Sequence, residues 1–576
     1  MQAVWLSVAV LTFHGDPAAI HPVPLGTVIA DFTLRDHRGG ERRLAEWREN
    51  GLVVIVFLGV DCPLVNRYAE RLCELARRYG PRGVAFIGVN ANAQDGVRDI
   101  ARYVRTHGIP FPILKDVGNV LADRLGATRT PEVFVLDQAR ALCYRGRIDD
   151  QFGVGTQKPE PYRRDLAEAL DELLAGKPVS QPTTDPAGCF IGRVSEPAGH
   201  GTVTWTRDVV PVLQKRCQAC HRPGQAAPFP LLTYEDASGW ADTIREVIEQ
   251  GRMPPWHADP RHGRFANDPS LSRAEKAALL GWIDAGCPRG DLRDLPAPAQ
   301  FPDDWRIGKP DRIIPIPEAF DVPAQGIIDY QLFEVDPGFA TDTWVAAAEI
   351  RPGNPAVVHH STVYLAPPTA PGTHGLTADF GLSCLVAAAP GTPPMVVPEG
   401  TGKRVPAGWH FLFVVHYVAI GSAQRDQTRV GLRLADPRTV RKEVTTHLLI
   451  DSEFRIPPRA KDFQIEKEWQ APADVQLLSM FPHGHWRARS FRYEAIYPDG
   501  DREILLDVPR YEFTWQNAYI LAEPKRLPRG TIVRCLARYD NSSGNPVNPD
   551  PDQEVSAGPQ STDEMFNGYF DWVLVD

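Results

Sequence analysis

Hydrophobic and polar positions follow two different patterns along the chain, and the first pattern covers residues 20–180. Short apolar runs typical of buried strands alternate with stretches in which apolar residues recur every three to four positions, as in amphipathic helices. The strand-like runs are 52–58, 84–90 and 131–137, and the helix-like stretches are 66–80, 97–108 and 162–176. This alternation predicts a sheet with helices on both faces, that is, an α/β domain over 20–180.

The second pattern begins at residue 299, where helical periodicity nearly disappears. Strand-like runs such as 356–365 and 409–418 are separated by Pro, Gly and Asp. A region of roughly 280 residues with this pattern is long enough for two all-β, jelly-roll-like sandwiches. We place these sandwiches at 299–442 and 443–576.

A smaller unit lies between the two regions. Residues 271–288 have an apolar helix face that opens with a capping box formed by Ser272 and Glu275. We therefore predict a small all-α domain over 201–298, joined to the α/β domain by a linker over 181–200.

Length and charge narrow the class of protein. A chain of 576 residues is too long for one hydrophobic core, so several domains are expected. The net charge is −10 and the basic residues form no stripe, which argues against a nucleic-acid partner. The nine cysteines are too dispersed for a small disulfide-stapled fold.

One apolar run, Val4–Phe13, lies near the start of the sequence. It is too short to span a bilayer and has the length of a signal-peptide core, although no Lys or Arg precedes it. We interpret 1–19 as a candidate signal segment, and we expect no integral membrane segment elsewhere.

Cys62 stands where the strand-like run 52–58 ends and a helix begins, a position that lowers the pKa of a thiol. Pro131 precedes the strand-like run 131–137. On these features the segment resembles the AhpC/TSA-type redoxins of the thioredoxin and peroxiredoxin group, which implies a thioredoxin-like fold, a cis proline facing the active cysteine, and a catalytic role for Cys62. The residue three positions after Cys62 is Val65, so a Cys-x-x-Cys pair is absent. A single reactive thiol then needs another cysteine to resolve it, and Cys189 is the best candidate by position.

Cys217, Cys220 and His221 form a Cys-x-x-Cys-His run. Zinc would need a fourth ligand at suitable spacing, and a bare redox Cys-x-x-Cys has no use for the histidine, whereas covalently bound haem uses all three residues. The segment resembles a small class I c-type cytochrome. That resemblance implies haem c on the two cysteines, His221 as the axial ligand, and Met253 as the sixth ligand, although Met253 can equally be a core residue.

Histidines are grouped in the β-rich half. His483 and His485, two positions apart, lie on one face of a strand and can chelate a metal together, whereas His359 and His360 are adjacent and need a bulge or twist to do so. His416 lies in another apolar strand. Imidazoles combined with the thioether of a late methionine, Met565, favour copper over zinc.

This constellation resembles the copper type II, ascorbate-dependent monooxygenases, the family of peptidylglycine α-hydroxylating and dopamine β-monooxygenases. The resemblance implies two copper ions that face each other across a cleft. It assigns His359, His360 and His416 to an electron-donating copper in the first sandwich. It assigns His483, His485 and Met565 to an O2-binding copper in the second.

The same resemblance bears on the substrate. Asn567 and Tyr569 occupy the spacings at which the peptidylglycine enzymes hold a substrate carboxylate, but Phe481 stands where those enzymes have an arginine. We therefore expect a small-molecule or peptide-like substrate whose identity is open, with O2 as the second substrate.

The sequence thus predicts an exported oxidoreductase with copper and haem c, located in the periplasm or outside the cell because haem is attached to this motif outside the cytoplasm. Electrons would come through the haem and the redoxin, or from ascorbate, another reductant or a periplasmic donor. Two alternatives stay open: a non-catalytic copper or electron-relay protein, and a thiol peroxidase centred on the redoxin.

Overall fold

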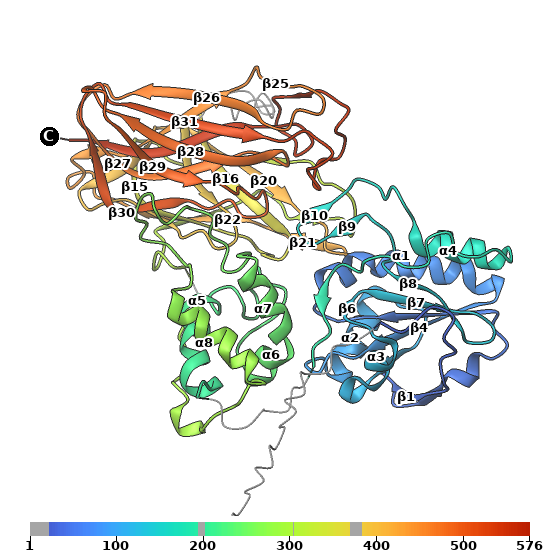
Figure 1. Cartoon of the computed structure of the whole chain (residues 1–576). Helices are drawn as coiled ribbons and strands as arrows, with labels where there is room; N and C mark the ends of the chain where they lie inside the picture. The colour runs from blue at the N-terminus through green and yellow to red at the C-terminus, as the bar shows by residue number, and fades with distance from the viewer. Residues whose placement is uncertain (1–21, 194–201, 303–304, 369–382, 576) are drawn as a thin grey trace, which may run out of the picture.

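The computed structural model describes residues 22–193, 202–302, 305–368 and 383–575 (Figure 1). The predicted signal segment, 1–19, lies outside the described residues. Figure 1 shows an α/β body and a smaller helical body that both lie along one side of a large β body.

A seven-stranded sheet in the order β2-β1-β5-β4-β3-β7-β8 forms the centre of the α/β body. Its strands are β1 (Thr33–Asp36), β2 (Glu41–Arg43), β3 (Leu52–Phe57), β4 (Val84–Asn90), β5 (Ile113–Lys115), β7 (Glu132–Leu136) and β8 (Leu142–Gly146). The strands β3, β4 and β5 are parallel, whereas β7 runs antiparallel to β3. Every residue of β3 and β4 is buried, which explains their continuous apolar sequence.

Helices cover both faces of this sheet and confirm the predicted α/β fold. They are α1 (Pro63–Tyr79), α2 (Val97–His107), α3 (Val120–Leu125) and α4 (Asp165–Leu174). Alternate residues of β3 enter two separate cores: Val54 packs with Leu72 of α1, and Val53 packs with Leu121 of α3. The predicted helices agree with α1, α2 and α4 to within a few residues.

The described residues 202–302 form short helices packed around a tryptophan core. The helices are α5 (Val210–Arg216), α6 (Tyr234–Gly239), α7 (Ala241–Glu249) and α8 (Arg273–Asp284), with a π-helical turn at Trp205–Val209 before them. The Ser272 side chain accepts a hydrogen bond from the Glu275 N–H, so the predicted capping box is present at the start of α8. Trp205, Trp240 and Trp282 lie in the core. The helices are few and short, and the cytochrome assignment stays a prediction.

In the described residues beyond 305 the chain is built from strands and turns, with no helix. The first pair consists of two sheets that face each other. One sheet contains β12 (Arg312–Pro315), β15 (Thr343–Arg351), β18 (Met395–Val396), β19 (Thr401–Val405), β22 (Arg429–Leu434) and β23 (Lys442–Glu443). The other contains β14 (Gln331–Val335), β16 (Val358–Ala366), β17 (Ser383–Ala388) and β20 (His410–Tyr417). The second pair also consists of two facing sheets. One contains β24 (Thr445–Asp451), β27 (Val475–His483), β30 (Tyr519–Leu527) and β33 (Phe566–Leu574). The other contains β26 (Phe463–Gln470), β28 (Ala488–Ile496), β29 (Arg502–Val508) and β31 (Ile532–Tyr539).

Within each pair an apolar core joins the two sheets. Val345 of β15 and Phe411 of β20 share one core, and Leu477 of β27 and Tyr493 of β28 share another. The β-rich region is therefore consistent with the predicted pair of sandwiches.

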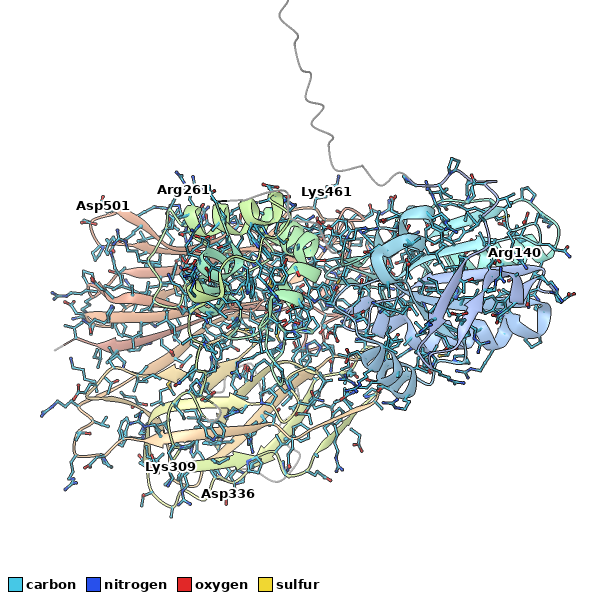
Figure 2. The ribbon with its side chains drawn as sticks, turned by 90° about the horizontal axis from the view of Figure 1, so that it is seen from below. Arg140, Arg261, Lys309, Asp336, Lys461 and Asp501 are labelled. Carbon is cyan, nitrogen blue, oxygen red and sulfur yellow. The ribbon has the colours of Figure 1, made fainter. Side chains whose placement is uncertain are left out.

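The bodies contact one another through specific pairs of residues. Arg129 of the α/β body forms an ion pair with Glu246 of α7, at 2.6 Å between Nη2 and Oε1. Phe265 of the helical segment forms an isolated β-bridge with Leu521 of β30. Figure 2, seen from below, shows the helical segment lying over the β-rich region, with the α/β body to one side. In the part of the chain that the structure describes, every helix is too short or too polar to cross a bilayer.

Candidate functional site

Cys62 is the residue immediately before α1 and follows β3 after a short loop, and its side chain is fully buried. Its thiol donates a hydrogen bond to the Thr130 carbonyl, with 3.0 Å between Sγ and O. The Thr130–Pro131 peptide bond is cis, as the redoxin resemblance implies. The strand-to-helix position predicted for Cys62 is therefore correct.

Cys189 lies beside Cys62, although the two are far apart in sequence. The short strand β11 (Cys189–Phe190) pairs with β6 (Arg129–Thr130), which sets Cys189 opposite Thr130. The two thiols are hydrogen-bonded to each other. The structure thus brings together the cysteine pair that the sequence suggested only by position.

Hydrogen bonds give the two thiols opposite pKa shifts. Burial alone would raise the pKa of Cys62, but hydrogen bonds from the thiol and backbone N–H of Cys189, the Val65 N–H and Thr130 bring it down to about 6. The hydrogen bond to Cys62, together with burial, raises the pKa of Cys189 well above its ordinary value. The Val65 N–H belongs to the first turn of α1, so the helix N-terminus that the sequence pointed to favours the Cys62 thiolate together with the hydrogen bonds from Cys189 and Thr130.

The Cys-x-x-Cys-His run follows α5, with Cys217 at the end of that helix. Cys217, Cys220 and His221 are half-buried. The Nδ1 atom of His221 lies 3.1 Å from the Phe229 carbonyl oxygen, so Nδ1–H can donate there and leave Nε2 available to a metal. Met253 is half-buried and lies just beyond α7. This donor set fits a covalently attached haem.

His359, His360 and His416 converge on one point, because one ring nitrogen from each lies within 4.8 Å of those of the other two. The Nδ1 atoms of His359 and His360 are 3.0 Å apart, and those of His416 and His359 are 3.3 Å apart. The pairing of β16 with β20 shifts register between Val358 and His360. That bulge lets adjacent histidines reach the same point, as the sequence required.

The second histidine pair, His483 and His485, lies at and just beyond the end of β27. His483 Nδ1 is 2.8 Å from Gln516 Oε1, and His485 Nδ1 is 3.4 Å from the Asp563 carbonyl oxygen. The buried Nε2 of His485 has no hydrogen-bond partner among the described residues. Both rings are therefore oriented through Nδ1, which leaves Nε2 for a metal.

Met565 immediately precedes β33, and its sulfur lies 3.6 Å from the Asn567 amide nitrogen. The buried Glu564 carboxylate accepts hydrogen bonds from the backbone N–H groups of His485, Arg487 and Met565. Glu564 therefore ties the loop of the second histidine pair to the methionine. Burial raises the pKa of Glu564 to about 7.

The two histidine groups adjoin, whereas the sequence predicted sites facing each other across a cleft. The ring centroids of His360 and His483 are only 5.5 Å apart. Phe513 packs against His359, at 4.9 Å between centroids, and against three other rings of the cluster. Tyr330 stacks on His416 at 4.6 Å. The groups meet because the sheets that carry them pack together at this end of the β-rich region.

Burial, the largest cause, lowers the pKa of every histidine in the cluster, and neighbouring imidazoles lower most of them further. The pKa values of His359 and His483 fall to about 4. At neutral pH the rings are therefore uncharged, which is the form that binds metals.

A pocket opens beside the cluster. It is lined by His360, His483, Met565 and uncharged or apolar side chains, among them Tyr330, Tyr364, Phe481, Gln516, Asn567 and Tyr569. The hydroxyl groups of Tyr364 and Tyr569 are 2.7 Å apart. No Lys, Arg, Asp or Glu is among the described residues that line it.

Sequence reasoning missed four residues of this site: Tyr330, Phe513, Gln516 and Glu564. Glu564 carried the clearest signal, because it precedes Met565 directly in the sequence. The other three are single residues without a metal-ligand spacing, and long-range strand pairing brings them to the cluster.

The comparisons with known proteins concern the α/β body. The AhpC/TSA family model matches residues 25–145. The thiol-disulfide oxidoreductases ResA of Geobacillus thermodenitrificans and Halalkalibacterium halodurans are 28% identical over 116 residues and 30% identical over 113 residues. Each alignment covers 20% of this chain, and 65% and 62% of the respective relative, so the chain spans less than two thirds of their length.

A solved structure, that of a hypothetical protein from Sinorhizobium meliloti 1021, has 32% sequence identity over 30% of this chain and 95% of that chain, with a TM-score of 0.28. On the match to the family model, residues 25–145 of this chain form a thioredoxin-like redoxin domain of the AhpC/TSA family.

Proposed function

We propose that the chain is an exported multidomain oxidoreductase whose β-rich half is a copper-dependent monooxygenase. It would insert one oxygen atom of O2 into a C–H bond of a small organic substrate. The observation that carries this proposal is the convergence of five imidazoles and one thioether beside a single pocket.

The residues present fit two copper ions. Two nitrogens that bind one metal, each about 2.0 Å from it, lie roughly 3 Å apart, which matches the separations among His359, His360 and His416. The buried, unpartnered Nε2 of His485 is the kind of atom that a metal would satisfy. Bound copper would supply one-electron redox chemistry and the activation of O2, and the thioether of Met565 would favour Cu(I).

The chain's own residues would orient and enclose these groups. The carbonyl of Asp563 and the amide of Gln516 fix the ring orientations of the second pair. The three N–H groups bound to Glu564 hold the loop beside Met565 in place. Tyr330 and Phe513 pack over the rings and exclude water from them.

The lining of the pocket suggests the class of substrate. Phe481 stands where a cation would be needed to bind a carboxylate, and the other lining residues are uncharged at neutral pH. The Asn567 amide and the Tyr569 hydroxyl can hydrogen-bond a neutral polar group of the substrate. A neutral small molecule therefore fits the pocket better than a peptide with a free carboxylate.

Haem c held by Cys217, Cys220 and His221 would supply a one-electron carrier. The loop after Met253 packs against the second sandwich. There the Asn517 side-chain amide donates a hydrogen bond to the Pro255 carbonyl oxygen, with 3.0 Å between Nδ2 and O. In the same loop, His257 Nε2 lies 3.9 Å from Glu512 Oε1, and Phe513, the next residue, packs on both histidine groups. This packed path supports the assignment of Cys217, Cys220 and His221 as the residues that would hold a one-electron carrier for the copper cluster, with ascorbate or another reductant as the alternative source of electrons.

The test measures bound copper and O2 consumption together in full-length protein expressed with haem-attachment machinery. We expect two copper ions per chain and reductant-dependent O2 uptake. Met565→Ala should abolish O2 uptake while the first histidine group retains copper. Met395→Ala, a half-buried methionine of β18 outside the pocket, is the matched control. Full activity in Met565→Ala would refute the assignment, and bound copper without O2 uptake would instead support a non-catalytic relay.

The redoxin domain supports a second function, thiol redox chemistry at Cys62. The favouring observation is the buried contact between Cys62 and Cys189, which the copper reaction does not use. A peroxidase assay with hydrogen peroxide tests one form of it, since loss of turnover in Cys62→Ser is expected if peroxide is the oxidant.

A further inference from the structure

The start of α1 is held against the loop that follows β20, the strand that carries His416. Gly421 of this loop packs directly on the peptide bond between Asn66 and Arg67. A Cβ at Gly421 would lie 1.8 Å from the Asn66 carbonyl oxygen and 3.0 Å from the Arg67 backbone nitrogen. The Gly421 carbonyl also accepts a hydrogen bond from the imidazole of His107, at the end of α2. The redoxin therefore meets the first histidine sandwich at Arg67.

The Arg67 guanidinium is half-buried, and no carboxylate of the described residues pairs with it. Its contacts are neutral. Nη1 donates a hydrogen bond to Gln157 Oε1 of β10 (Thr156–Gln157) at 3.3 Å, and the guanidinium lies 5.8 Å from the ring centre of Phe152 in β9 (Phe152–Gly153). Burial lowers the pKa of Arg67, yet an arginine stays charged at neutral pH. A partly buried charge that nothing neutralises costs free energy, so this arginine calls for an explanation.

The acidic residues that precede β9 are already paired with other cations. Asp149 forms an ion pair with Arg71. Asp150 pairs with Lys158, at 2.5 Å between Oδ2 and Nζ. Neither carboxylate is available to neutralise Arg67, so the positive charge of Arg67 acts undiminished on the neighbouring sandwich.

That charge reaches the first histidine group at His359. After burial and the neighbouring imidazole of His483, the Arg67 charge is a further cause that lowers the pKa of His359, because a second positive charge is unfavourable beside a guanidinium. The same repulsion acts on any cation that His359 binds, and it is proportional to the charge of that cation. A divalent ion is therefore repelled about twice as strongly as a monovalent ion at the same place.

We propose that Arg67 is part of the first histidine site although it belongs to the redoxin, and that its unpaired charge makes this site favour Cu(I) over Cu(II). The inference rests on the proposed copper function and adds a residue that raises the reduction potential of one site. A higher potential helps that site to accept an electron from a donor. The redoxin thus completes the site without contributing a ligand.

Two substitutions separate the charge of Arg67 from its shape. Arg67→Gln removes the charge and keeps an amide that can hydrogen-bond Gln157, whereas Arg67→Lys keeps the charge and loses the planar guanidinium. Arg78→Gln is the matched control, because Arg78 lies on the same helix, is exposed, and pairs with Asp171 of α4.

The experiment is a redox titration of the full-length, copper-loaded protein, followed by the electron paramagnetic resonance signal of Cu(II). The transition of the first site is the one that His416→Ala removes. In Arg67→Gln we expect its Cu(II)/Cu(I) equilibrium to shift at least tenfold toward Cu(II), which lowers the reduction potential by about 59 mV or more. Arg67→Lys should restore most of this shift, and Arg78→Gln should keep the wild-type potential.

Three results would overturn the proposal: an unchanged potential in Arg67→Gln, an equal shift in Arg78→Gln, or an Arg67→Lys protein that behaves like Arg67→Gln. The last result would assign the effect to the shape of the side chain and not to its charge. All three leave the copper function standing, whereas wild-type protein that binds no copper would remove both proposals.

Discussion

Gly421 joins the redoxin to the first sandwich, and its replacement by alanine should loosen that junction specifically. It lies in the loop after β20, the strand that carries His416, and its φ is +90°. A Cβ there would lie 1.8 Å from the carbonyl oxygen of Asn66 and 2.4 Å from its carbonyl carbon. Asn66 is in the first turn of α1, four residues beyond Cys62.

The magnitude follows from two separate costs. A side chain at positive φ costs roughly 1–2 kcal/mol. The clash adds to it, because a carbon–oxygen contact needs about 3.3 Å, so the two backbones must part by about 1.5 Å. Overpacking of this kind costs a further 1–3 kcal/mol or so, which corresponds to roughly a 5- to 150-fold change in an opening equilibrium.

The assay is amide hydrogen exchange of α1 in the full-length protein, since local opening is measurable there even when unfolding has several steps. Gly408→Ala is the matched control: it lies in the same sandwich at a φ of +71°, with nothing within 4 Å of the added Cβ. Exchange of 63–79 should accelerate in Gly421→Ala and stay at the wild-type rate in Gly408→Ala. Equal exchange in the two variants would refute the reasoning, because backbone strain alone would then explain both.

Three further predictions concern the sites themselves. His416→Ala should leave copper at the Met565 site but restrict the protein to a single turnover, because the second electron no longer arrives. Copper analysis together with the amount of product formed per protein molecule checks this, and repeated turnover at the wild-type rate would contradict it. Denatured protein should keep its haem on a gel, and Met253→Ala should lower the haem reduction potential measured by redox titration; an unchanged potential and spectrum would place the sixth ligand elsewhere. In reduced protein, the Cys62 thiolate absorbance should grow as pH rises through about 6, since its hydrogen bonds offset burial, and Cys189→Ala, which removes the thiol donor, should move that midpoint upward. A midpoint near the ordinary thiol value in both proteins would contradict this assignment.

The α/β fold was predictable because its strands are buried on both faces and therefore read as continuous apolar runs. The strand β3 shows this plainly, with every residue buried. Helix ends were also predictable from the sequence where a local motif marks them, as the capping residue Ser272 does at the start of α8. These signals are local, so they do not depend on which strands pair.

The candidate sites were only partly predictable, because their geometry depends on long-range pairing. The convergence of His359 and His360 needs a register shift against β20 that no local sequence feature announces. Gln516 and Phe513 lie in a loop of the second sandwich. Gln516 reaches His483 of the same sandwich, whereas the contact of Phe513 with His359 exists only because the two sandwiches meet. Cys189 fell in a predicted linker, yet it is a paired strand residue beside Cys62.

The strand β11, which brings Cys189 to Cys62, has a practical consequence for work on fragments of this chain. A piece cut at residue 180, or at the end of the family match, would lack Cys189 and also the buried Ile191, which completes one face of the sheet core. In such a piece Cys62 would lack its neighbouring thiol and would be prone to overoxidation or to pairing between molecules. The smallest piece that preserves the native thiol chemistry therefore extends at least through residue 193.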